Sequence, residues 1–242
     1  ANGKSITAAG DANITITALH STPSADLSGL AKGSGTITAT FGGTNTFTGV
    51  LGLASVSVTT GNTMTISAAK AADKTITGTG SGSVNVTALD ATLSADLSAV
   101  TVAGGGTLTG TFTASQEFAG NFGTAGMTVT ISDGVTMTVA ANLVDGSDGP
   151  TLQKDGGSGT GIVAVRIGTA DAAVNMTTIS SSGAASTTFT VFQTISNFTG
   201  TLASVATGVA NGVTLNLAAA KAAGKTITGT GSGSVNVTAL DA

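Results

Sequence analysis

Short runs in which polar and apolar residues alternate recur along the whole chain. Examples are SVNVTAL (83–89), GTLTGTFT (106–113) and VTMTVA (135–140). A period of two places successive side chains on opposite faces of a strand. Thr, Val and Ile favour extended backbone, and clusters of Gly, Asn, Asp and Ser at intervals of about ten residues are typical of turns. The pattern predicts an all-β chain of many short strands, with AAKAADK (68–74) as a short helical turn or loop.

The chain repeats itself on two scales. The segment KTITGTGSGSVNVTALDA at 74–91 recurs unchanged at 225–242, and residues 4–30 align with 74–100. Internal repeats of this kind indicate an array of similar structural units. The alignment predicts repeats of about 70–80 residues, the second of which carries a loop insertion at 144–157. Their predicted bounds are 4–73, 74–154, 155–224 and, for the start of a fourth repeat, 225–242.

The fourth repeat stops in the middle of its motif, at ALDA, where the earlier copy continues into TLSADLS. Copies this similar indicate a recent duplication, as in a long tandem array. We therefore expect the natural chain to continue beyond this segment.

Regular short strands leave two architectures open, a β-solenoid resembling a parallel β-helix and a row of immunoglobulin-like β-sandwiches. The repeats are shorter than the roughly 100 residues of a typical sandwich. Aromatic residues make up only 3% of the chain and charged residues 8%, and the only prolines are Pro23 and Pro150, so no Pro-rich linker separates the repeats. A narrow solenoid interior suits such small side chains. The sequence favours the solenoid, with tandem sandwiches as the alternative.

The phenylalanines form pairs whose members lie six residues apart. They could be core residues at a bend or an aromatic platform for a ligand, and carbohydrate platforms normally use Trp and Tyr, which the chain lacks. We therefore predict that these side chains belong to the core. The pairs are Phe41 and Phe47, Phe112 and Phe118, and Phe192 and Phe198.

Composition and charge argue against several classes of function. The mean hydropathy is +0.40 and the net charge −4, unlike the low hydropathy and high charge of disordered chains. The eight Lys and Arg residues are scattered, so no basic stripe is available for a nucleic acid. No apolar run reaches the roughly 18 residues of a membrane span. There is no cysteine, and hence no disulfide.

Candidate catalytic groups are few. His20 is the only histidine, its counterpart in the next repeat is Asp90, and no serine lies in a nucleophile motif. Asp26 and Asp96 both belong to a repeated SADLS motif, which favours a structural task such as capping a turn. We therefore expect no enzymatic activity.

One cluster of carboxylates could bind a metal ion. Asp145, Asp148 and Asp155 lie in the Gly-rich insertion, and Ca²⁺ prefers several oxygen ligands on a flexible loop. Their spacing matches no EF-hand loop, and a solvated loop is the favoured interpretation. These three residues are the candidate Ca²⁺ site, and no other cofactor is expected.

The motifs TMTISAAKAADKTITGTGSGSVNVTAL (63–89) and LSADLSAVTV (93–102) resemble repeats of giant bacterial surface proteins. That group includes β-strand-repeat adhesins, S-layer-like proteins and extracellular filament proteins. The resemblance implies export to the cell surface, a rod-like or layered assembly, and no catalysis.

These observations favour a structural repeat segment of a large extracellular protein. Such a segment would form a filament, a sheath, an S-layer or an adhesin stalk by self-association with other copies or tandem repeats. The alternative is an adhesin module that binds carbohydrate, such as cell-surface polysaccharide, or another surface, for which loop 144–157 is the candidate patch. Ice binding by ranks of Thr-x-Thr is a third hypothesis, against which the irregular spacing of those triplets argues.

Overall fold

The chain folds as a parallel β-solenoid of about eleven turns, as a computed structural model shows. The strand pairs whose register is described are all parallel, for example β6 with β8 and β14 with β16. The predicted solenoid and its tandem-repeat character are confirmed. The alternative of immunoglobulin-like sandwiches is wrong, because those domains are built from antiparallel sheets. The structure describes residues 3–123, 126–145, 149–154, 160–178, 181–182 and 186–239.

The solenoid divides into two compact units, each with its own buried core. Unit 1 comprises residues 1–111 and 120–128, and unit 2 comprises 112–119 and 129–242. This division does not follow the four sequence repeats, whose bounds stay a prediction.

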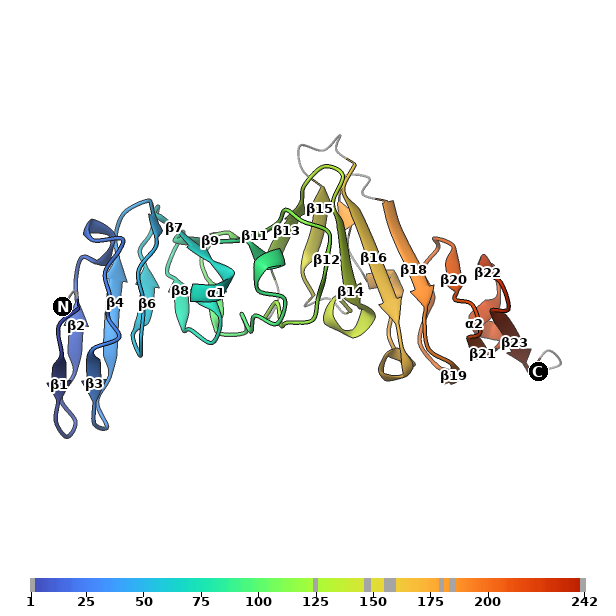
Figure 1. The fold of residues 1–242 in the computed structure, drawn as a ribbon, viewed down its shortest axis with the longest axis horizontal. Helices are drawn as coiled ribbons and strands as arrows, with labels where there is room; N and C mark the ends of the chain where they lie inside the picture. Colours follow the sequence, from blue (N-terminus) through green and yellow to red (C-terminus); the bar gives the residue numbers. More distant parts are fainter. Residues whose placement is uncertain are drawn as a thin grey trace. The chain divides into compact units, whose positions relative to one another are not determined.

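Unit 1 is made of short strands, two or three to a turn (Figure 1). Its sheets have the strand orders β1-β3, β2-β4-β6-β8-β10 and β5-β7-β9-β11. The corners carry the helical turns η1 (Leu19–Ser21), α1 (Ala68–Ala71) and η2 (Leu89–Ala91). The strands are β1 (Ile6–Ala8), β2 (Ile14–Ile16), β3 (Leu30–Lys32), β4 (Ile37–Phe41), β5 (Asn45–Phe47), β6 (Ser55–Val58), β7 (Thr63–Ser67), β8 (Ile76–Gly78), β9 (Ser83–Thr87), β10 (Val100–Val102) and β11 (Leu108–Phe112), the last residue of which belongs to unit 2.

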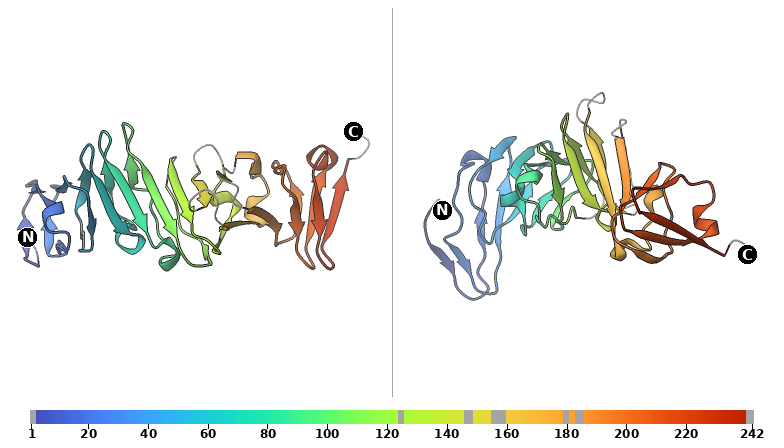
Figure 2. Two further views of the ribbon diagram at one scale, coloured as in Figure 1. Left: turned by 90° about the horizontal axis from the view of Figure 1, so that it is seen from above. Right: turned by 45° about the vertical axis from the view of Figure 1, so that its right-hand side comes forward.

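Unit 2 repeats this plan with longer strands near its middle (Figure 2). Its sheets have the orders β12-β14-β16-β18-β20-β22, β13-β15-β17 and β19-β21-β23. Its helical turns are η3 (Ala141–Leu143), η5 (Thr169–Asp171), η6 (Met176–Thr178) and α2 (Ala219–Ala222). The strands are β12 (Gln116–Phe118), β13 (Met127–Ile131), which begins in unit 1, β14 (Thr136–Ala140), β15 (Thr151–Lys154), β16 (Ile162–Ile167), β17 (Ser181–Ser182), β18 (Ser186–Val191), β19 (Ile195–Phe198), β20 (Thr207–Val209), β21 (Thr214–Ala218), β22 (Ile227–Gly229) and β23 (Ser234–Thr238).

The alternating pattern of the sequence becomes an alternation of burial. In β9, Val84 and Val86 point inward and are fully buried, while Ser83, Asn85 and Thr87 are half-buried on the outer face. Parallel register then stacks like on like, since Val84 lies beside Met64 of the turn before and Leu108 of the turn after. The core is thus a set of apolar columns.

Most of the phenylalanines occupy the core, as predicted. Phe41, Phe47, Phe112, Phe118 and Phe198 are each at most 1% exposed. Phe192 differs, because it is half-buried and lies outside the core. Val191 takes the inward position and pairs with Val209, as Phe41 pairs with Val58 in unit 1. The prediction was therefore wrong for Phe192, because the chain is shifted by one residue at this point.

The long repeat corresponds to two equivalent stretches of solenoid. The elements β7, α1, β8 and β9 of unit 1 have the same order and lengths as β21, α2, β22 and β23 of unit 2, displaced by 151 residues. Thr63 pairs with Ser83 in the first stretch and Thr214 with Ser234 in the second. The predicted helical turn at AAKAADK is confirmed as α1. Repetition of sequence therefore repeats the turn of the solenoid.

Candidate functional site

The carboxylate cluster expected in loop 144–157 is only partly visible. Asp148 and Asp155 lie outside the described residues. Asp145 is half-buried, and its Oδ1 accepts the backbone N–H of Asn175 at 3.1 Å. Among the described residues no group of three His, Asp or Glu side chains converges as metal ligands do. Asp145 is therefore seen joining one turn to the next, and the Ca²⁺ site stays a prediction.

A second carboxylate, which the sequence analysis did not single out, has a similar structural task. Asp171 is 3% exposed and lies in η5. Its Oδ2 accepts the N–H of Gly168 at 2.6 Å, and its Oδ1 accepts the N–H of Asn142 at 2.9 Å. A buried carboxylate needs such donors, and two backbone N–H groups supply them. Asp171 thus fastens η5 to the preceding turn.

His20 supports a corner of unit 1. It lies in η1, half-buried, and its Nδ1 accepts the N–H of Gly42 at 3.1 Å. Its ring meets that of Phe41 edge to face, with centroids 6.1 Å apart. The sequence predicted His20 at a surface turn. In the structure its ring also accepts a hydrogen bond from the following turn of the solenoid.

The SADLS carboxylates cap turns, as predicted. Oδ1 of Asp26 accepts the N–H of Ser28, and Oδ1 of Asp96 that of Ser98, both at 2.9 Å. The bonds from Ser28 and Ser98 hold the pKa of each carboxyl below its usual value. Asn121 and Asn175 form the same type of turn. The side-chain oxygen of Asn121 accepts the backbone N–H of Gly123, and that of Asn175 accepts the backbone N–H of Thr177. The sequence signal for such a turn is an Asn or Asp two residues before a small or hydroxyl-bearing residue.

Unit 2 carries an ionic contact across several turns. Arg166 Nη1 of β16 lies 2.5 Å from Glu117 Oε2 of β12, with β14 between the two strands. The guanidinium also stacks on the ring of Phe192, 3.9 Å from its centroid. Both charged side chains are partly exposed, at 35% and 49%. The cluster ties three turns together on the outer face.

Polar side chains on the outer faces bond from turn to turn. Thr109 donates to Asn85 at 3.0 Å, Asn236 donates to Asn216 at 2.8 Å, and the hydroxyls of Thr214 and Ser234 are 2.9 Å apart. Each bond joins residues 20 or 24 positions apart, about one turn of the solenoid. These ladders use polar groups to hold successive turns in register.

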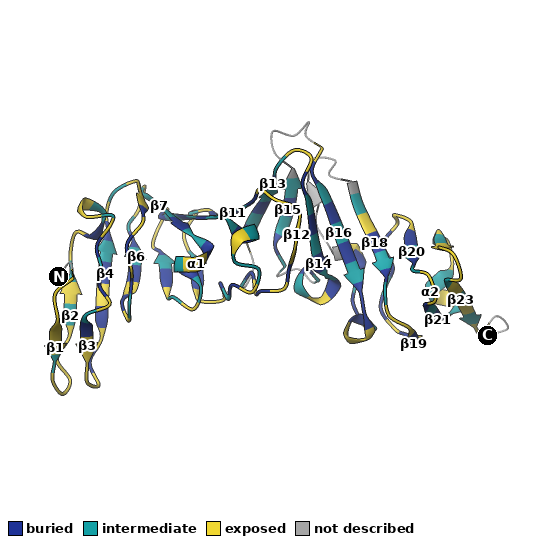
Figure 3. Cartoon of the chain, in the orientation of Figure 1, coloured by how far each residue is buried: buried dark blue, intermediate teal, exposed yellow. Residues whose placement is uncertain are grey.

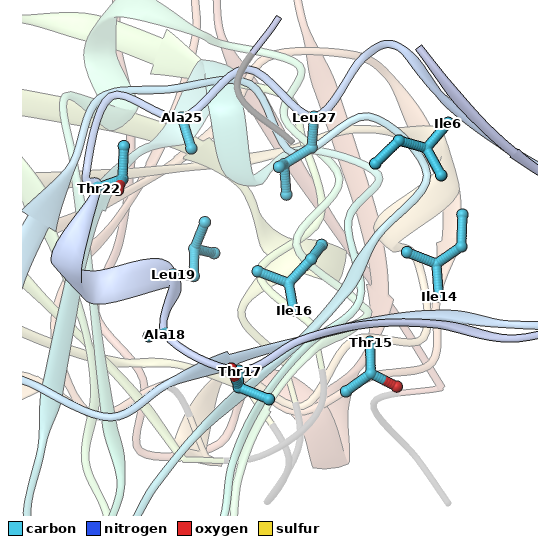
Figure 4. Close-up of a pocket in the computed structure, with 10 residues that line it drawn as sticks. All are labelled: Ile6, Ile14, Thr15, Ile16, Thr17, Ala18, Leu19, Thr22, Ala25 and Leu27. Atoms are coloured by element: carbon cyan, nitrogen blue, oxygen red, sulfur yellow. The ribbon is translucent and has the colours of Figure 1, made fainter. Parts of the chain in front are cut away.

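The first turn of unit 1 leaves its apolar core open at one end. A cavity of about 420 Å³ lies there, lined mainly by aliphatic side chains. Figure 4 shows Ile6, Ile14, Ile16, Leu19 and Leu27 directed toward this common space. The strands β1 and β2 are the last in their sheets, and Ile6 is 43% exposed. We call this surface, formed by residues 4–27, the N-terminal face.

The last turn of unit 2 is open in the same way. The strands β22 and β23 are also the last in their sheets. Their inward residues Ile227, Val235 and Val237 are only half-buried, so β23 carries the intermediate and exposed colours in Figure 3 and no buried one. We call this surface, formed by residues 225–238, the C-terminal face.

A smaller pocket, open to solvent, lies in unit 2. It has a volume of about 160 Å³ and is lined by residues that include Met176, Thr187 and Phe189. The buried hydroxyls of Thr187 and Thr207 have no hydrogen-bond partner among the described residues. Thr187 lines this polar space, which suits ordered water of the kind that commonly satisfies such a hydroxyl.

The described side chains are thus mostly engaged in holding turns together, and the two end faces are the surfaces left with apolar core residues uncovered. No helix in the described ranges is long and apolar enough to cross a membrane. Comparison of the chain with protein-family models, curated protein sequences and solved structures found no match.

Proposed function

We propose that this chain is a non-catalytic structural module of an extracellular protein, which builds an extended surface structure such as a filament, sheath, S-layer or adhesin stalk by self-association. The observation that carries the proposal is the equivalence of the two stretches β7-α1-β8-β9 and β21-α2-β22-β23. The chain gains length by adding copies of one turn, which is how repeat proteins build extended structures.

The chemistry of the turns supports this function. Their inward columns are apolar, with Phe41 and Val58 as neighbours in one and Val191 and Val209 in another. Their outward rows are Thr, Ser and Asn, which bond to the rows above and below, as Asn236 does to Asn216. Such side chains add rigidity and solubility with very little charge.

The test is cryo-electron microscopy of the purified chain over a range of concentrations. The proposal expects ordered fibres or sheets that give a repeat of about 4.8 Å, the spacing of hydrogen-bonded strands, along the solenoid axis. A chain that stays as isolated particles at every concentration would contradict it. Native material would be examined in parallel, because it holds the assembly in its natural state.

A further inference from the structure

Three tight turns of the solenoid share one backbone conformation. Gly61 in unit 1 and Gly134 and Gly212 in unit 2 have φ values of 76°, 70° and 73°, in the left-handed region. A Cβ on any of them would meet nothing within 4 Å, so space does not explain why glycine stands there. The backbone angle does, because residues with a side chain rarely adopt it.

The residues before these glycines make two of the turns chemically reactive. They are Thr60 in unit 1, and Asp133 and Asn211 in unit 2. In an Asn-Gly or Asp-Gly pair the unhindered glycine nitrogen can attack the neighbouring side-chain carbonyl carbon, Cγ. A bond forms between N and Cγ, the glycine nitrogen loses its proton, and ammonia leaves from Asn or water from Asp. Solvent water then opens the succinimide ring, to give Asp or isoaspartate. Thr60 has no carbonyl group and cannot react in this way.

A residue of the following turn holds both reacting groups of the Asn211–Gly212 pair. The Oγ of Ser232 accepts the N–H of Gly212 at 3.1 Å. The backbone N–H and the hydroxyl of Ser232 donate to Oδ1 of Asn211, at 2.8 and 2.9 Å. Closing the ring removes the proton from the glycine nitrogen and draws Cγ of Asn211 onto it. The reaction therefore has to break the bonds that Ser232 makes.

The Asp133–Gly134 pair is held in the same way. Oγ1 of Thr160 accepts the N–H of Gly134, and the N–H of Thr160 donates to Oδ1 of Asp133, both at 2.9 Å. In unit 1 the Oγ of Ser81 accepts the N–H of Gly61 at 3.0 Å. We call the Ser or Thr that accepts the glycine N–H the clamp residue. All three turns have one, including the turn whose first residue cannot react.

We propose that Asn211 and Asp133 are modification sites controlled by their clamp residues, Ser232 and Thr160. Succinimide formation is suppressed while the following turn is docked, and it proceeds when that turn opens locally. Isoaspartate carries one more carbon in the main chain, so it no longer presents the carbonyl oxygen and the glycine N–H at the spacing that the clamp residue binds. Each conversion is thus a lasting mark of a turn that has opened. The inference does not depend on the proposed function.

Ageing of the full chain at neutral pH, followed by peptide mapping with mass spectrometry, tests the clamp at Asn211. Ser232→Ala removes the acceptor of the Gly212 N–H. It should raise the rate of conversion roughly fivefold or more, the factor that corresponds to one net hydrogen bond of about 1 kcal/mol. Ser234→Ala is the matched control, because it removes a bond from the same turn to Thr214 and leaves the clamp in place. Its rate should equal that of the unaltered chain, and equal rates in the two variants would overturn the proposal.

The interior turn of unit 1 gives an independent test. Thr60→Asn creates an Asn-Gly pair there, which should convert slowly because Ser81 holds it. Adding Ser81→Ala should raise the rate by the same factor, whereas adding Ser83→Ala, which removes other bonds to a following turn, should not. Circular dichroism shows whether each variant is folded. The proposal fails if the Ser81→Ala change has no effect, or if Asn211 converts as fast in the folded chain as in the chain unfolded by guanidinium.

Discussion

At the end of β4 in unit 1 and of β18 in unit 2 the solenoid turns the same corner with different side chains. In unit 1, Phe41 points inward, Gly42 and Gly43 follow, and His20 of the preceding turn lies over them. In unit 2, Val191 points inward, and Phe192 and Gln193 follow. Gln193 Oε1 accepts the N–H of Thr169 at 3.1 Å, so here the later turn reaches back to the earlier one.

The position of glycine reverses between the two corners. A Cβ on Gly43 would lie 2.7 Å from Cδ2 of His20, and a Cβ on Gly168 would lie 2.7 Å from Oε1 of Gln193. Unit 1 therefore fills the corner from the earlier turn and needs glycine in the later one. Unit 2 fills it from the later turn, and Gly168 of the earlier turn leaves room for the end of the Gln193 side chain. Each corner has room for one side chain between successive turns, and it comes from the earlier turn in unit 1 and from the later turn in unit 2.

Removing the aromatic rings should give the largest difference between the corners. Phe41→Ala leaves a cavity in a fully buried site and is expected to lower the free energy of unfolding by about 3–5 kcal/mol. Phe192→Ala removes a half-exposed ring and the stack with Arg166, at a cost of about 1 kcal/mol. Denaturant titration followed by circular dichroism measures both. Equal losses would mean that Phe192 is a core residue after all.

Adding a methyl group at the glycines tests whether each corner holds one side chain only. Gly43→Ala displaces His20 and its bond to Gly42, which should cost roughly 1–2 kcal/mol of unfolding free energy. In the double variant with His20→Ala the methyl group has room, so the two costs should not add. Gly168→Ala with Gln193→Ala is the matched cycle in unit 2. Additive costs in both cycles would contradict the shared-space explanation.

The ionic cluster should distinguish unit 2 at a smaller scale. Arg166→Met removes the pair with Glu117 and the stack on Phe192, at a cost of about 0.5–1 kcal/mol because both charges are partly exposed. Glu117→Gln keeps the stack and should cost less. Thermal melts at low and high salt separate the two effects, since salt screens only the ion pair. An Arg166 effect that salt leaves unchanged and that Glu117→Gln matches would refute this division.

Acid should affect the capped turns of unit 1 more weakly than any of these changes. Asp26 and Asp96 have pKa values below that of the unfolded chain, because Ser28 and Ser98 donate to them. Their contribution to stability is therefore present above the pKa of the unfolded chain and is lost as the pH falls through the lowered folded-state pKa. Asn121 and Asn175 cap equivalent turns elsewhere in the solenoid, and an amide side chain has no proton to gain or lose in this pH range. The Asp26→Asn/Asp96→Asn double variant should fold normally and lose this part of the acid dependence; an unchanged acid profile would assign the dependence to other groups.

The sequence predicted the solenoid because two signals agreed, the period-two alternation and the repetition of whole turns. It also predicted α1 and the capping role of Asp26. It placed Phe192 in the core because the repeats aligned without a gap, and a shift of one residue moves a side chain to the other face of a strand. The cross-turn bonds of Asp145 and Asp171 join residues 30 and 29 positions apart, respectively, and no local pattern indicates such partners. Nor could the sequence show that identical segments differ in burial, since neighbouring turns determine it.

The cross-turn ladders have a kinetic consequence. Thr60 bonds to a residue 19 positions away and Thr109 to one 24 away, while Asp145 accepts from one 30 away, so the loop that must close to form each bond is about one turn long. The entropy of closing a loop rises only with the logarithm of its length, and that length does not grow as turns are added. Once one pair of turns has nucleated, each further turn can fold onto a finished edge. Folding should therefore proceed by propagation along the axis, at a time per turn that does not grow with the length of the protein.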